Sequence, residues 1–265
     1  MNIFETISLH RSVRNFDGCA ISDSQAKQIR QSIQHASSPF GGNYTIKLVN
    51  VDDVDEFKPS TYGVIKGAKS YLLLGLDVSD ARSWLSGGYA LEQVVLDITA
   101  MQLATCWVSG TFRSSSFERV ADLPQGQKLI AVIPVGVPAQ HKSFIEKLMR
   151  TFAKCGTRKP FSDMFFMNNF STPLPDDGQF AKPLEMMRWA PSAVNAQPWR
   201  ALVKGNEVDF YYTGSGNAKI LDMGIGLCHF ALACDALNVT GAYVNNEFHE
   251  SGPDGTTYLI SFIQA

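Results

Sequence analysis

Residues 188–203 of this chain read Arg-Trp-Ala-Pro-Ser-Ala-Val-Asn-Ala-Gln-Pro-Trp-Arg-Ala-Leu-Val, and residues 34–49 read Gln-His-Ala-Ser-Ser-Pro-Phe-Gly-Gly-Asn-Tyr-Thr-Ile-Lys-Leu-Val. The two stretches align without a gap, with Ala36 opposite Ala190. Each leads from the end of a helix-like pattern through turn residues into a β-like run. Self-similarity of this kind indicates an internal repeat, which governs the interpretation of the remaining sequence.

A second pair of stretches supports the duplication. Residues 88–96 parallel residues 224–232, and each stretch is expected to open an apolar helix. Each helix is expected to end before a β-like segment, at residues 106–108 and 242–244. Both copies then share the order helix, loop, strand, strand, helix, strand. We expect an α+β fold in which helices pack on an antiparallel or mixed sheet, with two similar halves forming a pseudo-dimer about an internal two-fold axis.

Local patterns place individual elements. The sequence Ser-Asp-Ser-Gln at residues 22–25 is a capping box and predicts a helix that runs toward Ala36. Apolar residues within 89–103 recur at helical spacing and predict a buried helix face. Short β-branched or aromatic runs predict strands at residues 46–51, 70–76, 129–135, 208–212 and 258–263.

A connector is expected between the copies. Residues 168–178 are rich in Asn, Pro, Asp and Ser, which is typical of a loop. We therefore divide the chain into two domains, residues 1–167 and residues 168–265.

The composition narrows the class of protein. The chain has 265 residues, of which 45% are hydrophobic and 18% charged, with a net charge of −2. These values describe a globular protein and give no reason to expect nucleic acid or a membrane as partner. No apolar run approaches the about 18 residues that span a bilayer, and residues 1–16 lack a signal-peptide core, so a cytoplasmic location is expected.

Cysteine and histidine usage argues against a disulfide framework or a metal site. The five cysteines have no C-x-x-C spacing, and the five histidines form no ligand pair. Cys106, Cys228 and Cys234 lie in apolar surroundings and are expected to be small buried residues.

Residues 11–14, Arg-Ser-Val-Arg, place two guanidinium groups and a hydroxyl within four positions. The planar fork of arginine matches phosphate oxygens, and a charge-assisted contact is about twice as strong as a neutral one. The motif is therefore a candidate phosphate site. The alternative is a solvated charge pair near the terminus.

Residues 190–199 form a second candidate site. Two prolines restrain the loop, so Ser192, Asn195 and Gln197 project from a stiff backbone. Carboxamides both donate and accept hydrogen bonds, which suits the alternating N–H and C=O edge of a flavin's pyrimidine ring. The alternative is a proline-braced connector between two elements.

These motifs resemble those of the nitroreductase family. Residues 190–200 are similar to its flavin loop, and residues 11–14 to its FMN-phosphate motif. Residues 106–112 resemble its segment that faces the flavin, and residues 123–138 its Leu-Pro-x-Gly…Pro-x-Gly-x-Pro strand. Residues 158–160, Arg-Lys-Pro, resemble a basic segment that also reaches the phosphate. The resemblance covers nearly the whole chain and is closest to the single-chain, internally duplicated branch.

The resemblance implies one complete flavin site per chain. In ordinary members the Arg-Ser-x-Arg motif and the Pro-Ser-x-x-Asn loop come from different subunits, whereas here each half keeps one part. The first copy has Gly41 opposite Asn195 and Asn43 opposite Gln197, and residues 168–187 contain no Arg-x-x-Arg. The second, pseudo-symmetric site is therefore expected to be degenerate.

The residues predicted to contact FMN come from both halves. Lys66 among them would place positive charge beside flavin N1–C2=O, with a plain surface lysine as the alternative. The full set is Arg11, Ser12, Arg14, Lys66, Val108, Gly110, Thr111, Arg158, Lys159, Pro191, Ser192, Ala193, Asn195 and Gln197.

The implied activity is reduction of nitroaromatics, quinones or flavins, with NADPH or NADH as reductant. Hydride would pass through flavin N5 in a ping-pong cycle, and no acid–base side chain is required. Two alternatives stay open: an FMN-binding carrier or sensor without turnover, and a dehalogenating or flavin-cleaving relative. The expected partner is a small-molecule electron acceptor, and the chain is expected to be a monomer or a weak homodimer.

Overall fold

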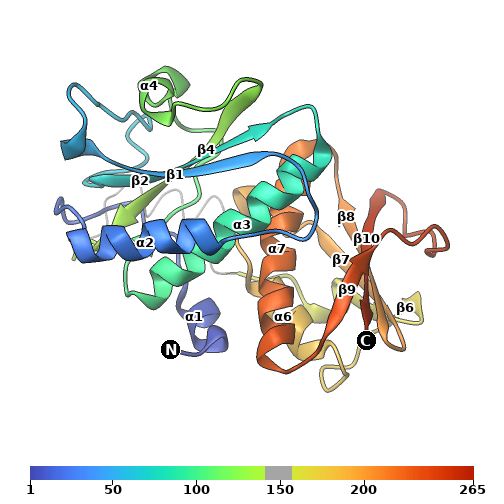
Figure 1. Ribbon diagram of the computed structural model, residues 1–265. Helices are drawn as coiled ribbons and strands as arrows, with labels where there is room; N and C mark the ends of the chain where they lie inside the picture. Colours follow the sequence, from blue (N-terminus) through green and yellow to red (C-terminus); the bar gives the residue numbers. More distant parts are fainter. Residues whose placement is uncertain (141–156) are drawn as a thin grey trace.

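The computed structural model describes residues 1–140 and 157–265. Two long helices, α3 (Ala81–Ala100) and α7 (Asn217–Ala236), pack against each other at the centre, and a β-sheet lies on either side of them (Figure 1). Within these described residues, the first sheet has four strands and the second has six. The predicted α+β architecture is confirmed.

The two halves repeat the same elements in the same order. The first half contains α2 (Asp23–His35), β1 (Tyr44–Asn50), β2 (Ser70–Asp77), α3, β3 (Ala104–Thr105) and β4 (Gln127–Gly136). The second half contains α6 (Ala181–Trp189), β7 (Trp199–Lys204), β8 (Glu207–Thr213), α7, β9 (Gly241–Val244) and β10 (Thr256–Gln264). The first sheet has the order β1-β2-β4-β3 and the second contains β7-β8-β10-β9, with antiparallel pairs throughout both series. Identical strand order confirms the predicted duplication.

A reciprocal contact marks the pseudo-two-fold axis where α3 and α7 cross. A Cβ atom on Gly88 would lie 2.3 Å from the carbonyl oxygen of Leu221, and one on Gly224 would lie 2.1 Å from that of Leu85. Leu85 and Leu221 hold equivalent positions in the two copies, so the contact is isologous, as at the interface of a symmetric dimer. Only glycine allows backbones to approach this closely.

The position of these glycines corrects one expectation. Gly88 and Gly224 were expected to open the two helices, but the helices begin earlier, at Ala81 and Asn217. The Asp80 side chain accepts a hydrogen bond from the Arg82 amide and caps α3. The glycines lie mid-helix because the crossing requires them, not because the chain turns there.

Most other local predictions are confirmed. Ser22 and Gln25 form the capping box of α2. The strands predicted at residues 46–51, 70–76, 129–135, 208–212 and 258–263 correspond to β1, β2, β4, β8 and β10. The predicted face of α3 is buried in the first-half core, through Leu91, Val94, Val95 and Ile98. Cys106, Cys228 and Cys234 are buried, as expected, whereas Cys155 lies outside the described residues.

Two segments differ from expectation. Within residues 106–108, only Val108 pairs, through an isolated bridge to Val132, because β3 has already ended. Residues 168–178 contain the strand β6 (Asn169–Pro173), which pairs with β5 (Phe165–Met167). The ring centroid of Phe170 lies 5.5 Å from that of Phe166 and 5.1 Å from that of Tyr211. This apolar packing outweighs the loop-like composition.

The remaining elements are short and complete the packing. Strand β5 runs parallel to β7 and so joins the second sheet. Helix α1 (Ile3–Leu9) contributes Ile7 to the core that the second half forms. The others are η1 (Val51–Asp53), η2 (Ser114–Ser116), α4 (Glu118–Ala121), η3 (Phe161–Asp163) and η4 (Ala193–Asn195).

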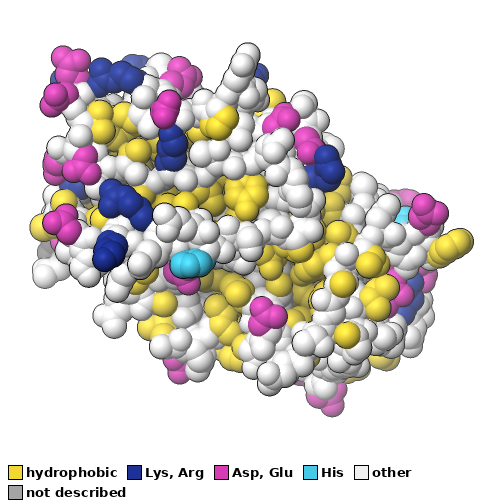
Figure 2. Space-filling view, viewed as in Figure 1, with side chains coloured by type: hydrophobic (Ala, Val, Ile, Leu, Met, Phe, Trp, Pro, Cys, Tyr) yellow, Lys and Arg dark blue, Asp and Glu magenta, His cyan; other side chains and the backbone are white. Residues whose placement is uncertain are grey.

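The surface carries no single-sign patch on the face seen in Figure 2, where acidic and basic side chains interleave. Among the described residues, no helix has both the length and the apolar character to cross a membrane.

Candidate functional site

A cavity of about 500 Å³ lies where the two halves meet. Its size falls in the range of small-molecule sites. The first half supplies most of residues 10–14 and all of residues 106–111, and the second supplies residues 189 and 191–195 together with part of α7. Of the residues predicted to bind FMN, those that line it are Arg11, Ser12, Arg14, Val108, Gly110, Thr111, Arg158, Pro191, Ser192, Ala193 and Asn195.

Backbone pairing fixes the arginine motif at the cavity edge. Ser12 forms a bridge with Thr105, and the Val13 amide donates to the Thr105 carbonyl at 2.9 Å. The Lys66 amide donates to the Arg14 carbonyl at 2.9 Å. These bonds hold the motif from both sides, so its side chains face the cavity from a rigid backbone.

Arg14 is the side chain that points most clearly to an anion. Its Nε and Nη1 atoms are buried, and among the described residues neither has a hydrogen-bond partner. Two buried guanidinium nitrogens without an acceptor are costly, whereas a phosphate would satisfy them through charge-assisted bonds. The residues present therefore fit a phosphorylated ligand.

Two further arginines gather around Trp189 in the same cavity. The guanidinium carbons of Arg11 and Arg158 lie 5.8 Å and 5.4 Å from the indole centroid. Arg158 also donates from Nη2 to the Trp189 carbonyl at 2.8 Å and from Nη1 to Asn195 Oδ1 at 3.3 Å. With Arg14, they make this cavity locally cationic although the chain as a whole is slightly acidic.

The loop after α6 is held in a strained conformation. Val194, Asn195 and Gln197 have positive φ values of 49°, 56° and 48°. Such backbone costs about 1–3 kcal/mol per residue and is most unusual for a β-branched side chain. The Ser192 hydroxyl accepts a hydrogen bond from the Gln197 amide at 2.9 Å and closes the turn. Strain therefore lies at the cavity wall.

Three predicted residues do not line the cavity. Gln197 is buried and accepts a hydrogen bond from the Lys159 amide at 2.9 Å, while Lys159 Nζ donates to the Ala196 carbonyl at 2.7 Å. Both residues brace the loop from behind. The Lys66 side chain is exposed, and its backbone pairs with residues 14–16. A flavin contact for Lys66, Lys159 or Gln197 stays a prediction.

Sequence reasoning missed Asp222, which lines the cavity from α7. It is 2% exposed, accepts a hydrogen bond from the Ala193 amide at 2.9 Å, and lies 3.8 Å from Lys219 Nζ. Burial raises the pKa of Asp222 to about 6. The sequence signal was a lone carboxylate early in an apolar helix.

His10 is a second residue that the sequence analysis did not assign. It lines the same cavity, and its Nε2 lies 3.3 Å from Thr105 Oγ1. Burial lowers the pKa of His10, which favours the neutral ring.

Aromatic rings occupy the pseudo-symmetric position in the other half. Phe40, the counterpart of Val194, makes edge contacts with Tyr89 at 5.5 Å and with Tyr243 at 4.9 Å. Tyr89 and Tyr243 are the counterparts of Ile225 and Trp107, which line the open cavity. The same scaffold thus carries an open site in one place and a packed cluster in the other.

The sequence matches the profile of a known family over residues 2–234, and that family is described as "Putative TM nitroreductase". The chain belongs to this nitroreductase family. No match was found among curated protein sequences.

One solved structure shares the fold over nearly the whole chain, and two others match about half of it. A Thermotoga maritima protein described as a "putative nitroreductase" is 22% identical, with a TM-score of 0.63; the alignment covers 99% of this chain and 94% of that one. A nitroreductase-family protein from Clostridium novyi is 19% identical, with a TM-score of 0.42 and coverage of 54% and 90%. A Clostridium difficile protein described as an FMN-dependent nitroreductase is 14% identical, with a TM-score of 0.43 and coverage of 53% and 90%.

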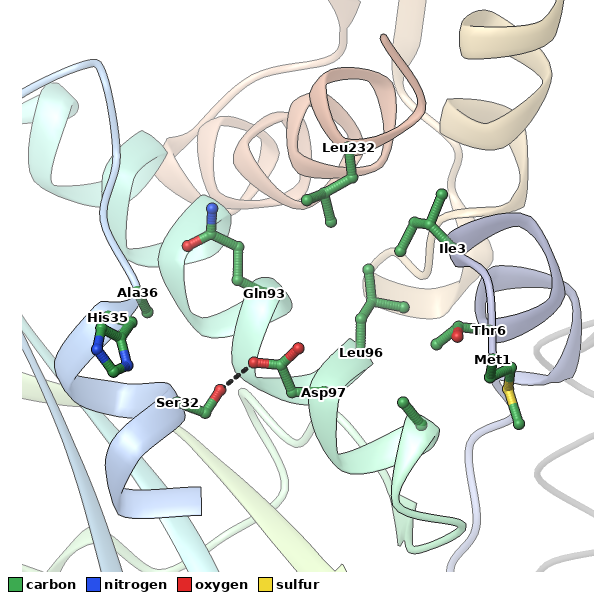
Figure 3. Close-up of a pocket in the computed structure, with 11 residues that line it drawn as sticks. Met1, Ile3, Thr6, Ser32, His35, Ala36, Gln93, Leu96, Asp97 and Leu232 are labelled. Atoms are coloured by element: carbon green, nitrogen blue, oxygen red, sulfur yellow. Dashed lines mark hydrogen bonds between the residues drawn. The ribbon is translucent and has the colours of Figure 1, made fainter. Parts of the chain in front are cut away.

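This nitroreductase-family chain has a further cavity of about 350 Å³, between α1, α2, α3 and α7 (Figure 3). Ser32 donates a hydrogen bond to Asp97 at its edge, while Ile3, Leu96 and Leu232 form an apolar floor. None of the predicted FMN residues lines it.

Proposed function

We propose that this nitroreductase-family chain is an FMN-dependent oxidoreductase that uses NADPH or NADH to reduce nitroaromatics, quinones or flavins. The observation that carries the proposal is Arg14, whose buried Nε and Nη1 lack a partner among the described residues and which lines a cavity of about 500 Å³ between the halves. A phosphorylated ligand satisfies those donors, and the family supplies the expectation of redox chemistry.

The cavity residues divide into two groups by chemistry. Arg11, Arg14 and Arg158 would hold the FMN phosphate, because all three line one cavity whose carboxylate, Asp222, already accepts a hydrogen bond from a loop amide. The segments 108–111 and 191–195 would flank the ring system. FMN, when bound, supplies two-electron transfer chemistry.

The protein's own task is then to orient ligands and exclude water. The walls are fixed by backbone pairing on one side and by the braced loop on the other, so a bound group meets little reorganisation. Reductant and acceptor would occupy the remaining space of the same cavity in turn.

Anaerobic stopped-flow absorbance tests the activity. Purified protein reconstituted with FMN is mixed with NADPH and, separately, with NADH. Bleaching of the flavin band by either, followed by its return on adding a quinone or a nitroaromatic, is the expected result. Binding of FMN without bleaching by either reductant would instead favour a flavin carrier.

Substitution of Arg14 tests the site. Arg14→Ala removes a charge-assisted contact of about 2–3 kcal/mol, so the Kd for FMN should rise by about 30- to 150-fold in a fluorescence titration. Arg30→Ala, which removes an exposed arginine on α2, is the matched control and should leave the Kd unchanged. Equal effects of the two variants would contradict the assignment.

A further inference from the structure

A buried polar network joins the two halves behind the cavity. Glu92 on α3 and His229 on α7 are both 0% exposed, and Glu92 Oε1 lies 2.8 Å from His229 Nε2. The other carboxylate oxygen accepts a hydrogen bond from Trp107 Nε1 at 2.7 Å. His229 Nδ1 lies 3.2 Å from the Met186 carbonyl oxygen. Trp107 is itself part of the cavity wall.

The hydrogen-bond partners fix nearly every proton in this network. The Met186 carbonyl can only accept, so His229 Nδ1 carries a proton and donates it. Trp107 Nε1 can only donate, so Glu92 Oε2 accepts. A single proton then lies between Glu92 Oε1 and His229 Nε2, whichever of the two groups holds it. Every buried donor and acceptor is satisfied, and such networks favour one rigid arrangement.

The duplication shows that this network belongs to the open site. The counterparts of Glu92 and His229 are Cys228 and Gln93, and the counterpart of Trp107 is Tyr243. Tyr243 Oη is buried and, within residues 1–140 and 157–265, has no hydrogen-bond partner. The half whose site is filled by aromatic rings therefore lacks the equivalent support.

We propose that the Glu92–His229 pair positions Trp107, and through it residues 107–111, against the ligand in the cavity. Glu92 and His229 are positioning residues, since the cavity is lined by Trp107 and neither of them. Glu92 comes from α3 and His229 from α7. The position of α3 relative to α7 therefore affects where Trp107 lies in the cavity wall. The inference rests on the proposed FMN site for its effect on binding, but not for its effect on Trp107.

Two substitutions of Glu92 separate this role from simple core packing. In Glu92→Gln the amide oxygen accepts from Trp107, and the amide nitrogen donates to a neutral His229 protonated at Nδ1, so every bond is kept. Glu92→Leu keeps the bulk but leaves Trp107 Nε1 without an acceptor. Glu92→Asp keeps the charge but is too short to span both bonds, and it decides the matter if Glu92→Leu does not fold.

The first readout uses FMN-free protein. The near-UV circular dichroism and fluorescence of Trp107 are obtained as the difference between each background and its Trp107→Phe version. We expect the wild-type signal in Glu92→Gln and its loss or shift in Glu92→Leu and Glu92→Asp. An unchanged Trp107 signal in those two variants would overturn the proposal.

The second readout is the Kd for FMN. Glu92→Gln should stay within about twofold of the wild-type Kd, whereas Glu92→Leu should raise it by about tenfold or more, because the loss of a buried partner shifts the cavity wall. A Glu92→Gln variant as impaired as Glu92→Leu would also overturn the proposal. If wild-type protein itself binds no FMN, the proposed function fails, and the Trp107 signal still decides the positioning role.

Discussion

Two equivalent loops of the repeat differ in their surroundings: one packs on its helix, and the other lines the cavity. Residues 36–43 are tied down on α3: the Asn43 amide donates to Ser83 Oγ at 2.8 Å, and Ser38 Oγ donates to Ser86 Oγ at 2.9 Å. The counterparts of Ser83 and Ser86 on α7 are Lys219 and Asp222. Short neutral serine side chains on α3 therefore hold the loop of residues 36–43 against that helix by hydrogen bonds.

The other loop, residues 190–197, stands over the cavity. Its Ala193 amide donates to the buried Asp222 carboxylate, and Val194 is 81% exposed where Phe40 in the first copy packs against two tyrosines. A few substitutions can therefore close a site without changing the fold of the backbone.

Both halves contribute an equivalent glycine to the crossing of α3 and α7. Gly88→Ala and Gly224→Ala each place a methyl group within 2.3 Å of a backbone carbonyl, which cannot move away easily. We expect each to lower the free energy of unfolding by about 3 kcal/mol, measured by urea denaturation. Gly87→Ala, whose new methyl would lie 3.2 Å from the end of a leucine side chain, is the control and should cost far less. Strongly unequal effects at the two crossing glycines would contradict the pseudo-symmetry.

The aromatic cluster is the feature that closes the first-half position. Phe40→Ala removes a ring packed against Tyr89 and Tyr243 and should lower the free energy of unfolding by about 2 kcal/mol. Because residues 168–187 hold no Arg-x-x-Arg to bind a second phosphate, the stoichiometry should stay at one FMN per chain. A second FMN bound by Phe40→Ala, seen in an equilibrium titration, would show that the ring alone blocked that site.

Asp222 is an ionisable residue at a position where the first half has the neutral Ser86. Its pKa in the folded protein, about 6, lies above its usual 3.8, so the fold disfavours the ionised form. Stability from this group is therefore full below about pH 4 and is lost as the pH rises to about 6. A shift of about two units corresponds to about 2–3 kcal/mol.

Asp222→Asn keeps an oxygen for the Ala193 amide but cannot ionise. Its free energy of unfolding, measured without FMN, should exceed that of the wild type by about 2 kcal/mol at pH 8 and by almost nothing at pH 4. Asp235→Asn, at an exposed position near the end of the same helix, serves as control. A difference that does not vary with pH would refute this account of Asp222.

Substitution of the asparagines in the two loops should change the Kd for FMN by different, smaller amounts. Asn195 donates from Nδ2 to the Thr157 carbonyl at 3.1 Å and accepts from Arg158, so Asn195→Ala should raise the Kd for FMN by about tenfold. Asn43→Ala, in the sealed loop, should leave the Kd unchanged. Equal losses in both variants would contradict a single FMN site per chain.

The sequence was sufficient for the parts of this molecule that depend on local pattern. The gap-free alignment of residues 34–49 with 188–203 predicted that α2 and α6 end at equivalent points, and both do, at His35 and Trp189. Arg14 and Asn195 are distant in sequence, and the structure brings them to one cavity. The repeat supplied the reason to expect this, because it implied that the two halves face each other.

Features that depend on packing between the halves could not be predicted. Gly88 and Gly224 have the same sequence signature whether they start a helix or lie where two helices cross, and only the three-dimensional contact decides. Asp222 and the Glu92–His229 pair involve single polar residues within apolar helices, which carry no motif. Their roles arise from burial against the opposite half, and burial of this kind has no local pattern.

The glycine crossing has a consequence for how the protein behaves on dilution. In a true dimer, an isologous helix contact forms only at sufficient protomer concentration, and any site built across it dissociates with it. Here both surfaces belong to one polypeptide, so each meets the other at a fixed, high effective concentration. The cavity between the halves should persist at nanomolar protein, and its ligand affinity should not depend on how much protein is present.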